Sequence, residues 1–355
     1  MLKVAIIGGS GYTGGELVRL LLDHPFVSIE AVTSERSAGK SVSQLFPGLL
    51  SGTTQARESR LLFEPLKIKA LIKKADLFFL CLPHKASQET VASLYKAGKK
   101  VIDLSADYRL RDAAVYQQWY QTRHRFPSLL KKSVYGLPEI YRSKLKGATV
   151  VANPGCYPVS AILGLAPIMK QSEMRAESII IDSKSGVSGA GRNPALPFMF
   201  SEVNESVKAY SVTTHRHTPE IEQALSVLSK RKIKVVFTPH LIPMDRGILS
   251  TIYVQLNKRV KLSSIQKIYR DFYRNEYFVR VLDNGAYPSS KAVKGSNYCD
   301  ISVFLDGRNP AKQTLIIVTA IDNLLKGASS QAIQNMNIMY GFDETTGLTD
   351  LPTCP

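Results

Sequence analysis

Apolar and polar residues alternate in blocks along the first part of the chain, and each block has the length of one strand or one helix. The predicted strands cover residues 3–7, 28–33, 76–82 and 101–104, and the predicted helices between them cover 16–22 and 87–97. The run at 76–82, DLFFLCL, is apolar throughout, which is typical of a strand buried on both faces of a sheet. Strands that alternate with helices in this order predict a parallel, doubly wound sheet.

The pattern changes at about residue 151, after which strand-like segments follow one another with few helices between them. The predicted strands cover 179–182, 235–238, 248–255, 301–304 and 315–320, and the predicted helices cover 263–273 and 331–340. Consecutive strands without crossover helices favour antiparallel pairing. The second part is therefore predicted to be an α+β domain with a largely antiparallel sheet, and the last helix is expected to pack back on the first domain.

The composition is that of an ordinary globular protein of 355 residues, with 44% apolar and 21% charged residues, and its length agrees with two domains. No apolar run is long enough to span a membrane, and the N-terminus lacks the features of a signal peptide. We expect a cytoplasmic protein without membrane contact. The cysteines show no metal-binding spacing, so free thiols and no metal site are predicted for Cys81, Cys156, Cys299 and Cys354.

The formal net charge is +17, from 46 basic and 29 acidic side chains. A basic field of this kind can attract nucleic acid or steer a small polyanion. The basic residues are scattered, and the densest clusters, Lys131–Lys132 and Lys230–Lys232, lack interleaved aromatic residues and a recognition motif. We therefore expect no specific nucleic-acid partner and keep a non-enzymatic nucleic-acid binder as the distant alternative.

A glycine-rich segment, GGSGYTGG at 8–15, follows the first predicted strand and precedes the first predicted helix. It contains the spacing GxGxxG at Gly9, Gly11 and Gly14, in the strand–turn–helix context that a dinucleotide-binding turn requires. Gly9 is expected to take the tight turn, Gly11 to let the backbone approach a pyrophosphate, and Gly14 to let helix and strand pack closely. The unpaired N–H groups of the helix start would then face the phosphates.

The residues after the second predicted strand, Ser34, Glu35 and Arg36, bear on the choice between NAD and NADP. An acidic residue there binds the ribose 2′-hydroxyl group of NAD, whereas a basic residue accepts the 2′-phosphate group of NADP. Ser34 and Arg36 favour the phosphate. Glu35 is the dissenting residue, and we expect it to point to solvent. The pattern predicts NADP.

A turn rich in Asn, Pro and Gly, ANPGCYP at 152–158, joins an apolar strand to a predicted helix at 159–169. Cys156 therefore lies at or just before a helix N-terminus, where the helix dipole favours a thiolate and thiol pKa values fall to about 3.5–7.5. A thiolate there is a good nucleophile toward an activated acyl group. Cys81, inside an apolar strand, fits instead the usual small buried cysteine.

Two of the six histidines lie in THRHTPE at 214–220. Thr218 and Pro219 are typical of a helix start, with Thr218 at the cap and Pro219 in the first turn. His217 then lies beside the helix start, where Glu220 can orient its ring. A histidine titrates near neutral pH and can transfer protons in both steps of a thioester mechanism. His217 is preferred to His215 because of Glu220, although residue chemistry alone does not separate the two.

The motifs GGSGYTGGEL, NPGCYP, SGVSGAGR and HRHTPE, in this order, resemble those of the N-acetyl-gamma-glutamyl-phosphate reductase family, and the resemblance runs from Val4 to about Met339. It implies a fold similar to aspartate-semialdehyde dehydrogenase and glyceraldehyde-3-phosphate dehydrogenase, with a Rossmann-type domain and a mixed α+β catalytic domain. We therefore expect an NADP-binding domain at 1–152, a catalytic and dimerisation domain at 153–324, and a C-terminal helix and tail at 325–355. A homo-oligomer, either dimer or tetramer, is expected.

Residue by residue, the resemblance implies Cys156 as the nucleophile and His217 as the proton-transfer group, with Glu220 as its partner. The residues expected to contact the cofactor are Gly9, Ser10, Gly11, Tyr12, Thr13, Gly14, Ser34, Arg36, Pro83, Ser185, Gly186 and Asn323. The residues expected to contact the small acyl-phosphate substrate are Arg109, Asn153, Ser188 and Gly189, with Arg109 as a clamp on the phosphate.

The activity implied by the resemblance is NADPH-dependent reduction of N-acetyl-L-glutamyl 5-phosphate to the 5-semialdehyde, with release of phosphate, in arginine biosynthesis. Cys156 would form a thioester, which keeps the carbonyl carbon electrophilic enough for hydride transfer. The alternative is a sibling reductase of carrier-linked aminoadipyl phosphate in lysine biosynthesis. The residues around Gly155-Cys156 favour the arginine-pathway reductase, whereas the high positive charge would suit an acidic carrier protein.

Overall fold

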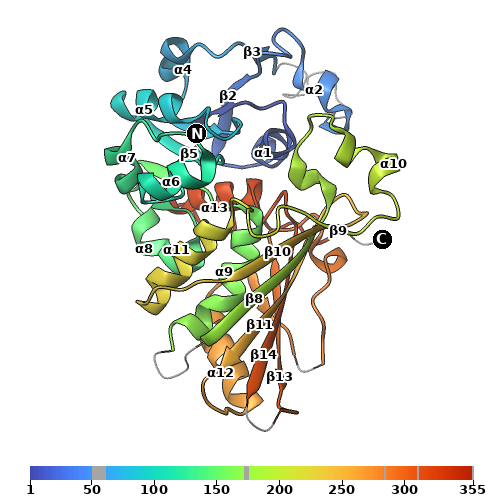
Figure 1. Ribbon diagram of the computed structural model, residues 1–355. Coiled ribbons are helices and arrows are strands. Elements are labelled where there is room, and N and C mark those ends of the chain that lie inside the picture. The colour runs from blue at the N-terminus through green and yellow to red at the C-terminus, as the bar shows by residue number, and fades with distance from the viewer. Residues whose placement is uncertain (50–60, 172–175, 284, 310–311, 354–355) are drawn as a thin grey trace. The chain divides into compact units, whose positions relative to one another are not determined.

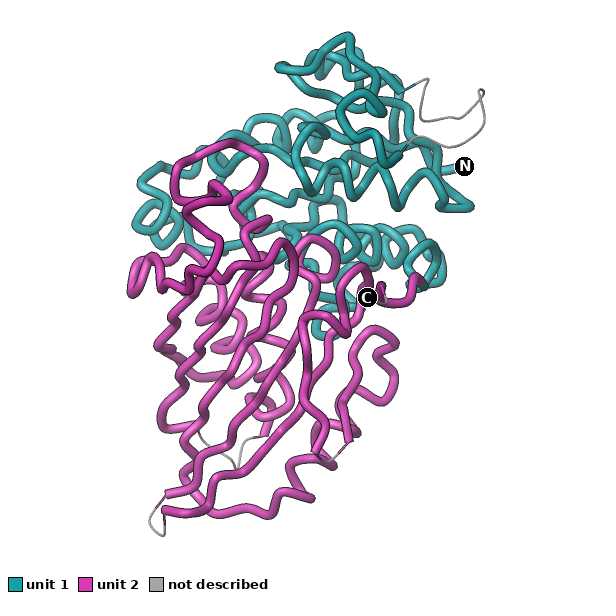
Figure 2. The backbone as a smooth tube through the Cα atoms, turned by 90° about the vertical axis from the view of Figure 1, so that its right-hand side faces the viewer, with its two compact units in different colours: residues 1–154, 328–349 teal, residues 155–327, 350–355 magenta. Residues whose placement is uncertain are grey.

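The computed structural model describes residues 1–49, 61–171, 176–283, 285–309 and 312–353, so Cys354 lies outside the described residues. The chain folds into two compact units, which Figure 2 shows in different colours. Unit 1 comprises Met1–Pro154 and Ala328–Thr349, and unit 2 comprises Gly155–Gly327 and Asp350–Pro355. The chain thus leaves unit 1 directly before Cys156.

Unit 1 is built on a seven-stranded sheet in which all neighbouring strands are parallel. Figure 1 labels β2, β3 and β5 of this sheet. The strand order is β3-β2-β1-β4-β5-β7-β6. The strands are β1 (Leu2–Ile7), β2 (Val27–Thr33), β3 (Phe63–Glu64), β4 (Leu77–Leu80), β5 (Lys100–Asp103), β6 (Val134–Tyr135) and β7 (Val150–Ala152). All four residues of β4 are buried, as the continuous apolar run predicts for a strand covered on both faces.

Helices connect these parallel strands, and the last helix of the chain belongs to the same unit. The helices are α1 (Tyr12–Leu22), α2 (Val42–Leu45), α4 (Ile68–Lys74), α5 (Gln88–Lys96), α6 (Ala113–Tyr120), α7 (Pro127–Lys132), α8 (Pro138–Leu145) and α13 (Ser329–Tyr340), with a 3₁₀ turn at Pro47–Leu49. α13 lies against α1, and Ser329 Oγ donates a hydrogen bond to the Thr13 carbonyl oxygen at 2.9 Å.

Unit 2 is built on a second seven-stranded sheet, in the order β12-β13-β14-β11-β8-β10-β9. Its strands are β8 (Ala176–Ser185), β9 (Lys208–Ala209), β10 (Val236–Leu241), β11 (Ile248–Leu256), β12 (Val279–Val281), β13 (Cys299–Asp306) and β14 (Gln313–Ile321). β11 pairs antiparallel with both β8 and β14. Among the described strand pairs of this sheet, β8–β10 and β12–β13 are parallel and the others are antiparallel. The predicted fold class, a doubly wound domain followed by a largely antiparallel α+β domain, is confirmed.

The helices of unit 2 are α9 (Cys156–Met169), α10 (Phe200–Val203), α11 (Thr218–Ser229) and α12 (Leu262–Tyr273), with 3₁₀ turns at Val187–Ala190, Leu196–Phe198 and Lys291–Val293. α9 packs on β11 and β14 and also contacts α11 and α12. Residues of β11 alternate along the strand: Ile252 is fully buried, whereas its neighbour Tyr253 is 38% exposed. The second face of the sheet is therefore more open than the face that packs on helices.

α9 is apolar all round and almost wholly buried, which is typical of a central core helix. Pro167 lies inside it and has no N–H group to donate to the Leu163 carbonyl oxygen. The hydroxyl group of Tyr273 donates to this carbonyl instead, and the hydroxyl group of Tyr269 donates to that of Gly164 at 2.6 Å. Two tyrosines of α12 thus satisfy carbonyl groups in the helix that begins with Cys156.

Several predicted elements had the right type and the wrong bounds. The first helix begins at Tyr12 rather than residue 16, because the glycines of the turn continue into its first turn. The helix after the cysteine begins at Cys156 rather than residue 159, and β8 covers Ala176–Ser185 rather than 179–182. The prediction missed α4, α6, α7 and α8, since helices of eight residues or fewer show little periodicity.

Candidate active site

The glycine-rich turn joins β1 to α1 in unit 1, and its glycines meet different steric demands. The positive φ of +80° is at Gly8, so the tight turn is not at Gly9 as predicted. A Cβ atom on Gly9 would lie 2.2 Å from Val32 Cγ1, and one on Gly14 would lie 2.5 Å from Gly9 Cα. Among the described residues, no atom lies within 4 Å of the Cβ position of Gly11. Close packing therefore accounts for Gly9 and Gly14, and Gly11 leaves open space at the turn.

The first turn of α1 is suited to bind an anion. The helix begins at Tyr12, the N-cap residue Gly11 has no side chain to cap it, and its first turn holds no acidic residue. N–H groups at a helix start have no intrahelical partner and, together with the helix dipole, favour a phosphate. Tyr12 is exposed and Thr13 half-buried beside these groups. The open space at Gly11 and the uncapped helix start fit a dinucleotide pyrophosphate.

The residues that follow β2 lie against the same turn. The Gly9 N–H group donates to the Thr33 carbonyl oxygen at 2.8 Å, and Ser34 Oγ donates to Ser10 Oγ at 2.8 Å. Glu35 is exposed, and its carboxylate accepts the N–H group of Leu66, just after β3, at 2.8 Å. Arg36 is exposed. The backbone just after β3 therefore holds the carboxylate of Glu35, the residue that favoured NAD in the sequence.

The loop after β4, which contains Pro83, starts at the same sheet edge as the glycine turn, because β1 and β4 are parallel neighbours. The strand order reverses between these two strands. In doubly wound sheets, ligands bind outside the carboxyl ends of the strands at such a switch point. Pro83 is exposed, and its carbonyl oxygen accepts the Ala86 N–H group at 3.1 Å.

A buried polar network, which was not predicted from the sequence, supports this loop. Asp107 accepts the Ser87 N–H group at 3.0 Å and the Tyr116 hydroxyl group at 2.8 Å. Asp103 accepts the N–H and hydroxyl groups of Ser105, at 3.0 and 2.8 Å, and burial, together with the charge of Asp107, raises the pKa of Asp103 to about 6. Ser87 Oγ lies within hydrogen-bond distance of both carboxylates, 3.0 Å from Asp103 Oδ2 and 2.9 Å from Asp107 Oδ2, and its one proton can go to either. The segment DLSAD at 103–107 was the available signal.

Arg109 and Asn153, both predicted to contact substrate, are buried in unit 1. Arg109 donates from Nε to the Asn153 carbonyl oxygen at 2.7 Å and from Nη2 to the Leu104 carbonyl oxygen at 2.8 Å. Asn153 donates from Nδ2 to the Ala328 carbonyl oxygen at 2.9 Å and accepts from Asn335 Nδ2 at 3.0 Å. These contacts hold the backbone of the turn that leads to Cys156, and the roles of both residues toward substrate stay predictions.

Cys156 is the first residue of α9, with Gly155 at the N-cap, and its side chain is half-buried. The N-cap residue Gly155 has no side chain to cap this helix, and the first turn holds no acidic residue, so the helix dipole acts on the thiol. A Cβ atom on Gly327 would lie 2.8 Å from Cys156 Cβ and 2.5 Å from the Asn323 carbonyl oxygen. Only glycine fits at position 327, and the chain therefore passes close beside the cysteine.

The carboxylate of Glu220 anchors the residue before Cys156. Glu220 lies in the first turn of α11, is 1% exposed, and its Oε1 accepts the Gly155 N–H group at 2.9 Å. A hydrogen bond to an ionised carboxylate is shorter and stronger than one between neutral groups. The prediction that Thr218 caps α11 was wrong, because His217 occupies the N-cap and no side chain caps the helix.

His215 and His217, which chemistry alone did not separate, have different environments. The Nδ1 atom of His215 accepts the backbone N–H group of His217 at 3.1 Å. The His215 ring lies edge-on to the rings of Tyr157, Tyr210 and Phe237, at centroid distances of 5.5, 5.5 and 5.3 Å. Burial, and secondarily the charge of the adjacent arginine, lowers the pKa of His215 to about 4. His215 is therefore neutral near pH 7, with its proton on Nε2.

Two tyrosines complete the cluster, and the sequence analysis assigned neither a role. The hydroxyl oxygens of Tyr157 and Tyr210 are 3.0 Å apart, and the Tyr157 ring lies 5.9 Å from that of His217. Burial raises the pKa of both phenols, that of Tyr210 to about 12, so both stay protonated at neutral pH. Tyr157 follows the cysteine directly in the chain, which was a signal, whereas nothing in the sequence marked Tyr210.

The residues of unit 2 predicted to contact the cofactor, Ser185, Gly186 and Asn323, lie close to those predicted to contact the substrate, Ser188 and Gly189. Asn323 Nδ2 donates to Ser188 Oγ at 2.9 Å, and Asn323 Oδ1 accepts the Gly247 N–H group at 2.7 Å. A Cβ atom on Gly189 would lie 3.5 Å from Ser185 Oγ and 3.7 Å from Asn323 Nδ2. A Cβ atom on Gly186 would lie 2.5 Å from a backbone carbonyl oxygen, so this position also requires glycine.

The other described cysteines differ from Cys156. Burial raises the pKa of Cys81 to about 12, and Cys299 is fully buried in β13. Among the described residues, no group of three or more His, Cys, Asp or Glu side chains could hold a metal ion. Within the same residues, no helix has the length and apolar character needed to cross a membrane.

Comparison with known proteins assigns this arrangement to a class. Residues 3–148 match the model of the semialdehyde dehydrogenase NAD-binding domain, and residues 156–323 match that of the semialdehyde dehydrogenase dimerisation domain. Aspartate semialdehyde dehydrogenase II of Vibrio cholerae, solved with ASA, has the same fold, with a TM-score of 0.71 at 15% identity over 95% of this chain and 98% of that one. The chain is therefore a semialdehyde dehydrogenase-type oxidoreductase with an NAD(P)-binding domain.

Closer relatives narrow the class. The chain is 54% identical to the N-acetyl-gamma-glutamyl-phosphate reductase of Geotalea daltonii and 53% identical to that of Geobacter metallireducens, over 100% of each chain. The NADP complex of aspartate semialdehyde dehydrogenase from Candida albicans shares the fold, with a TM-score of 0.66 at 15% identity over 96% of this chain and 100% of that one. The chain belongs to the N-acetyl-gamma-glutamyl-phosphate reductase family, as its motifs predicted.

Proposed function

We propose that this chain reduces N-acetyl-L-glutamyl 5-phosphate to N-acetyl-L-glutamate 5-semialdehyde, with NADPH as the hydride donor and phosphate as the second product. The observation that carries the proposal is Cys156 at the first position of α9, in a turn whose Gly155 N–H group is held by the buried carboxylate of Glu220. The substrate follows from the names of relatives more than 50% identical over the full chain.

In the first step, the Cys156 thiolate attacks the acyl carbon of the substrate. A sulfur–carbon bond forms, the bond between that carbon and the phosphate oxygen breaks, and phosphate leaves with the bonding electron pair. The N–H groups of the first turn of α9 lie next to the reacting atoms and favour negative charge on the carbonyl oxygen. Removal of one oxyanion donor typically costs about 10²–10³ in rate.

In the second step, the thioester carbonyl accepts a hydride, which NADPH supplies when it is bound. The carbonyl oxygen takes up a proton from His217 as the hemithioacetal forms. That proton returns to His217 when the carbon–sulfur bond breaks, so that the Cys156 thiolate leaves with the bonding electron pair and the aldehyde forms. His217 is the proton-transfer group in this scheme. His215 is less suited to this role, because burial keeps it neutral and its Nδ1 atom accepts a hydrogen bond from the His217 N–H group. Proton transfer by a positioned side chain contributes about 10²–10⁴ in rate.

We assign NADP rather than NAD on the residues that follow β2. Ser34 Oγ donates to Ser10 Oγ of the glycine turn, Arg36 is exposed, and the Glu35 carboxylate accepts a backbone N–H group just after β3. A basic residue at this place accepts a ribose 2′-phosphate, and a carboxylate would repel it. The residues proposed to contact the cofactor, besides Ser34 and Arg36, are Gly9, Ser10, Gly11, Tyr12, Thr13, Gly14, Pro83, Ser185, Gly186 and Asn323.

Arg109, Asn153, Ser188 and Gly189 are proposed to bind substrate in this scheme. We also propose that residues 1–152 bind the cofactor, that 153–324 carry catalysis and dimerisation, and that 325–355 return to the first of these domains. The more open face of the unit 2 sheet, which includes Ile180 and Tyr253, is suited to pair with a second copy, as a dimer or within a tetramer. The protein would work in the cytoplasm without a specific nucleic-acid partner.

The test is the reverse reaction, phosphate-dependent reduction of NADP with N-acetylglutamate semialdehyde. We expect turnover that requires phosphate and that is lost in Cys156→Ser. Aspartate semialdehyde and carrier-linked aminoadipate semialdehyde, assayed in parallel, should react much more slowly. Faster turnover of the carrier-linked aldehyde would assign the chain to the lysine-pathway reaction instead, and activity without phosphate would contradict the acyl-phosphate assignment.

A further inference from the structure

The proposed substrate carries a second anionic group, for which the proposed substrate contacts of unit 2, Ser188 and Gly189, provide no cation. Besides the acyl phosphate, N-acetyl-L-glutamyl 5-phosphate has a carboxylate on its α-carbon, and the aldehyde product keeps it. Arginine is well suited to a carboxylate in a partly buried site, because its planar guanidinium group donates two parallel hydrogen bonds. The proposed function therefore calls for an arginine close to Ser188, besides Arg109 of unit 1, which is assigned to the phosphate.

The turn between β10 and β11, residues 242–247, lies along the loop that contains Ser188. Backbone hydrogen bonds of 2.9–3.1 Å join the two segments in the pairs Ser185–Ile242, Val187–Met244, Ser188–Asp245 and Gly186–Gly247. A Cβ atom on Gly186 would lie 2.9 Å from the backbone nitrogen of Arg246, so the two segments touch at Arg246 itself. The backbone of Arg246 is therefore fixed against the loop that is proposed to contact cofactor and substrate.

Asn323 connects this turn to the nucleophile. Its Oδ1 atom accepts the N–H group of Gly247, the residue after Arg246, at 2.7 Å. A Cβ atom on Gly327 would lie 2.5 Å from the Asn323 carbonyl oxygen and 2.8 Å from Cys156 Cβ. A continuous series of contacts inside unit 2 therefore leads from Cys156 through Asn323 to the turn that carries Arg246.

A buried carboxylate attracts the side chain of Arg246. Its Nη1 atom lies 3.7 Å from Asp322 Oδ2, and the two side chains are 25% and 0% exposed. Asp322 Oδ2 accepts the Gly295 N–H group and Oδ1 accepts the Leu324 N–H group, each at 2.9 Å. Backbone groups thus bond the carboxylate, and its charge attracts the arginine from beyond hydrogen-bond distance. A guanidinium group has five N–H donors, so this attraction and a bidentate contact to a ligand carboxylate are compatible.

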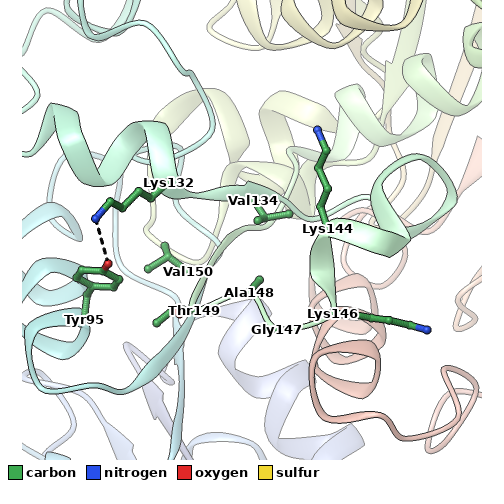
Figure 3. A pocket seen from close by; sticks show the side chains of 9 residues that line it. All are labelled: Tyr95, Lys132, Val134, Lys144, Lys146, Gly147, Ala148, Thr149 and Val150. Carbon is green, nitrogen blue, oxygen red and sulfur yellow. Dashed lines mark hydrogen bonds between the residues drawn. The ribbon is translucent and has the colours of Figure 1, made fainter.

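Exposed cations offer a weaker setting for a small carboxylate. Unit 1 has a hollow of ≈ 330 Å³ beside β6 and β7, and Lys132, Lys144 and Lys146 extend from its rim (Figure 3). All three lysines are exposed, and water and salt screen an ion pair at such a place. Arg192, which follows the Ser188 loop in unit 2, is exposed as well. Arg246 combines partial burial with a place beside the proposed substrate residues.

We propose that Arg246 binds the α-carboxylate of the substrate and thereby selects acyl phosphates and aldehydes that carry this group. The inference rests on the proposed function, because it names the residue that recognises one part of the substrate of that function. A site built to bond a charged group rejects a substrate that lacks the group. The specificity of the unchanged protein and of Arg246 variants should therefore depend on the carboxylate.

The test compares two aldehydes in the reverse reaction, with phosphate and NADP: N-acetylglutamate semialdehyde, and 4-acetamidobutanal, which is the same aldehyde without the carboxylate. The unchanged protein should prefer the first in kcat/KM by about tenfold or more. Arg246→Gln should lower kcat/KM for the first by about 10–100-fold, as expected for the loss of a hydrogen-bonded charge pair, and for 4-acetamidobutanal by less than about threefold. Arg246→Lys keeps the charge without the bidentate geometry and should lose less.

Two other arginines of unit 2 provide matched controls. Arg192→Gln changes an exposed cation that follows the same loop. Arg308→Gln makes the same charge change just after β13, on a side chain that is 91% exposed. Both variants should keep the preference for the aldehyde with the carboxylate, because neither side chain contacts that group in the proposal.

Several results would overturn the proposal. Equal losses with both aldehydes in Arg246→Gln would place the residue at the phosphate or in the support of the fold. Loss of the preference in Arg192→Gln instead would assign the carboxylate to that residue. Turnover of both aldehydes by the unchanged protein without preference would exclude recognition of the carboxylate, whereas turnover of neither would remove the proposed function and this inference with it. Thermal unfolding monitors folding, and Arg246→Lys replaces Arg246→Gln if that variant unfolds.

Discussion

His215 provides a direct test of how the backbone before α11 positions His217. Its Nδ1 atom accepts the His217 N–H group at 3.1 Å, among the rings of Tyr157, Tyr210 and Phe237. The variant His215→Asn keeps an acceptor near the place of Nδ1, whereas His215→Phe keeps an aromatic ring and removes the acceptor. His215→Phe leaves a partly buried N–H group without its partner, which costs about 1–3 kcal/mol of stability.

The activity should follow the acceptor rather than the ring. A catalytic group displaced by about 1 Å can lose about 10² in rate, so we expect His215→Phe to lower kcat by up to this factor. His215→Asn should lose less than about tenfold, because its side-chain oxygen can hold the same N–H group. Steady-state rates and NADPH binding on both folded variants decide the matter. Full activity of His215→Phe, or equal losses in the two variants, would refute the positioning role.

The pH dependence of stability gives a second readout of the same residue. The folded state lowers the pKa of His215 from 6.5 to about 4, so it favours the neutral ring. The contribution of this pKa shift to the free energy of unfolding is fully present above pH 6.5 and is lost as the pH falls from about 6.5 to about 4. Between pH 7 and pH 4.5, the free energy of unfolding of the His215→Asn variant, measured in urea, should therefore fall less than that of the unchanged protein. An identical acid-induced loss in both proteins would contradict the shifted pKa.

Three further predictions concern the rest of the site. Cys156 should react with iodoacetamide much faster than Cys81 or Cys299, and its alkylation should abolish turnover. Peptide mapping of partly labelled protein identifies the thiol that reacts first, and a first reaction at another cysteine would contradict the role of Cys156. NADPH should bind more tightly than NADH and Arg36→Ala should narrow the gap, so equal affinities in the unchanged protein would remove the NADP assignment. The variant Glu220→Gln keeps an acceptor for the Gly155 N–H group, so it should fold normally, with a lower kcat and an altered pH profile. The variant Glu220→Ala removes the acceptor and should lower the free energy of unfolding in urea by about 1–3 kcal/mol. Equal stability of the two variants would contradict the buried hydrogen bond.

The sequence predicted the fold because its signals are local. The apolar run in β4 and the glycine spacing at Gly9–Gly14 each have a physical cause within a few residues of chain. Four short motifs in a fixed order indicated the family, and the comparisons confirm it. The bounds of elements were less certain, since a helix start such as that at Cys156 depends on what packs against its first turn.

The tertiary structure decided how the residues act on one another. Local chemistry made Glu220 a partner of His217, and the fold places its carboxylate on the Gly155 N–H group, which is 65 residues away in the chain. The fold also gives His215 an environment different from that of His217, because the three aromatic rings around His215 come from α9, from β10 and from the chain after β9. The sequence by itself determined the elements, the motifs and the class of chemistry, because these follow from neighbouring residues. Burial, pKa and hydrogen-bond partners depend on segments far apart in the chain, and only the packed structure decided them.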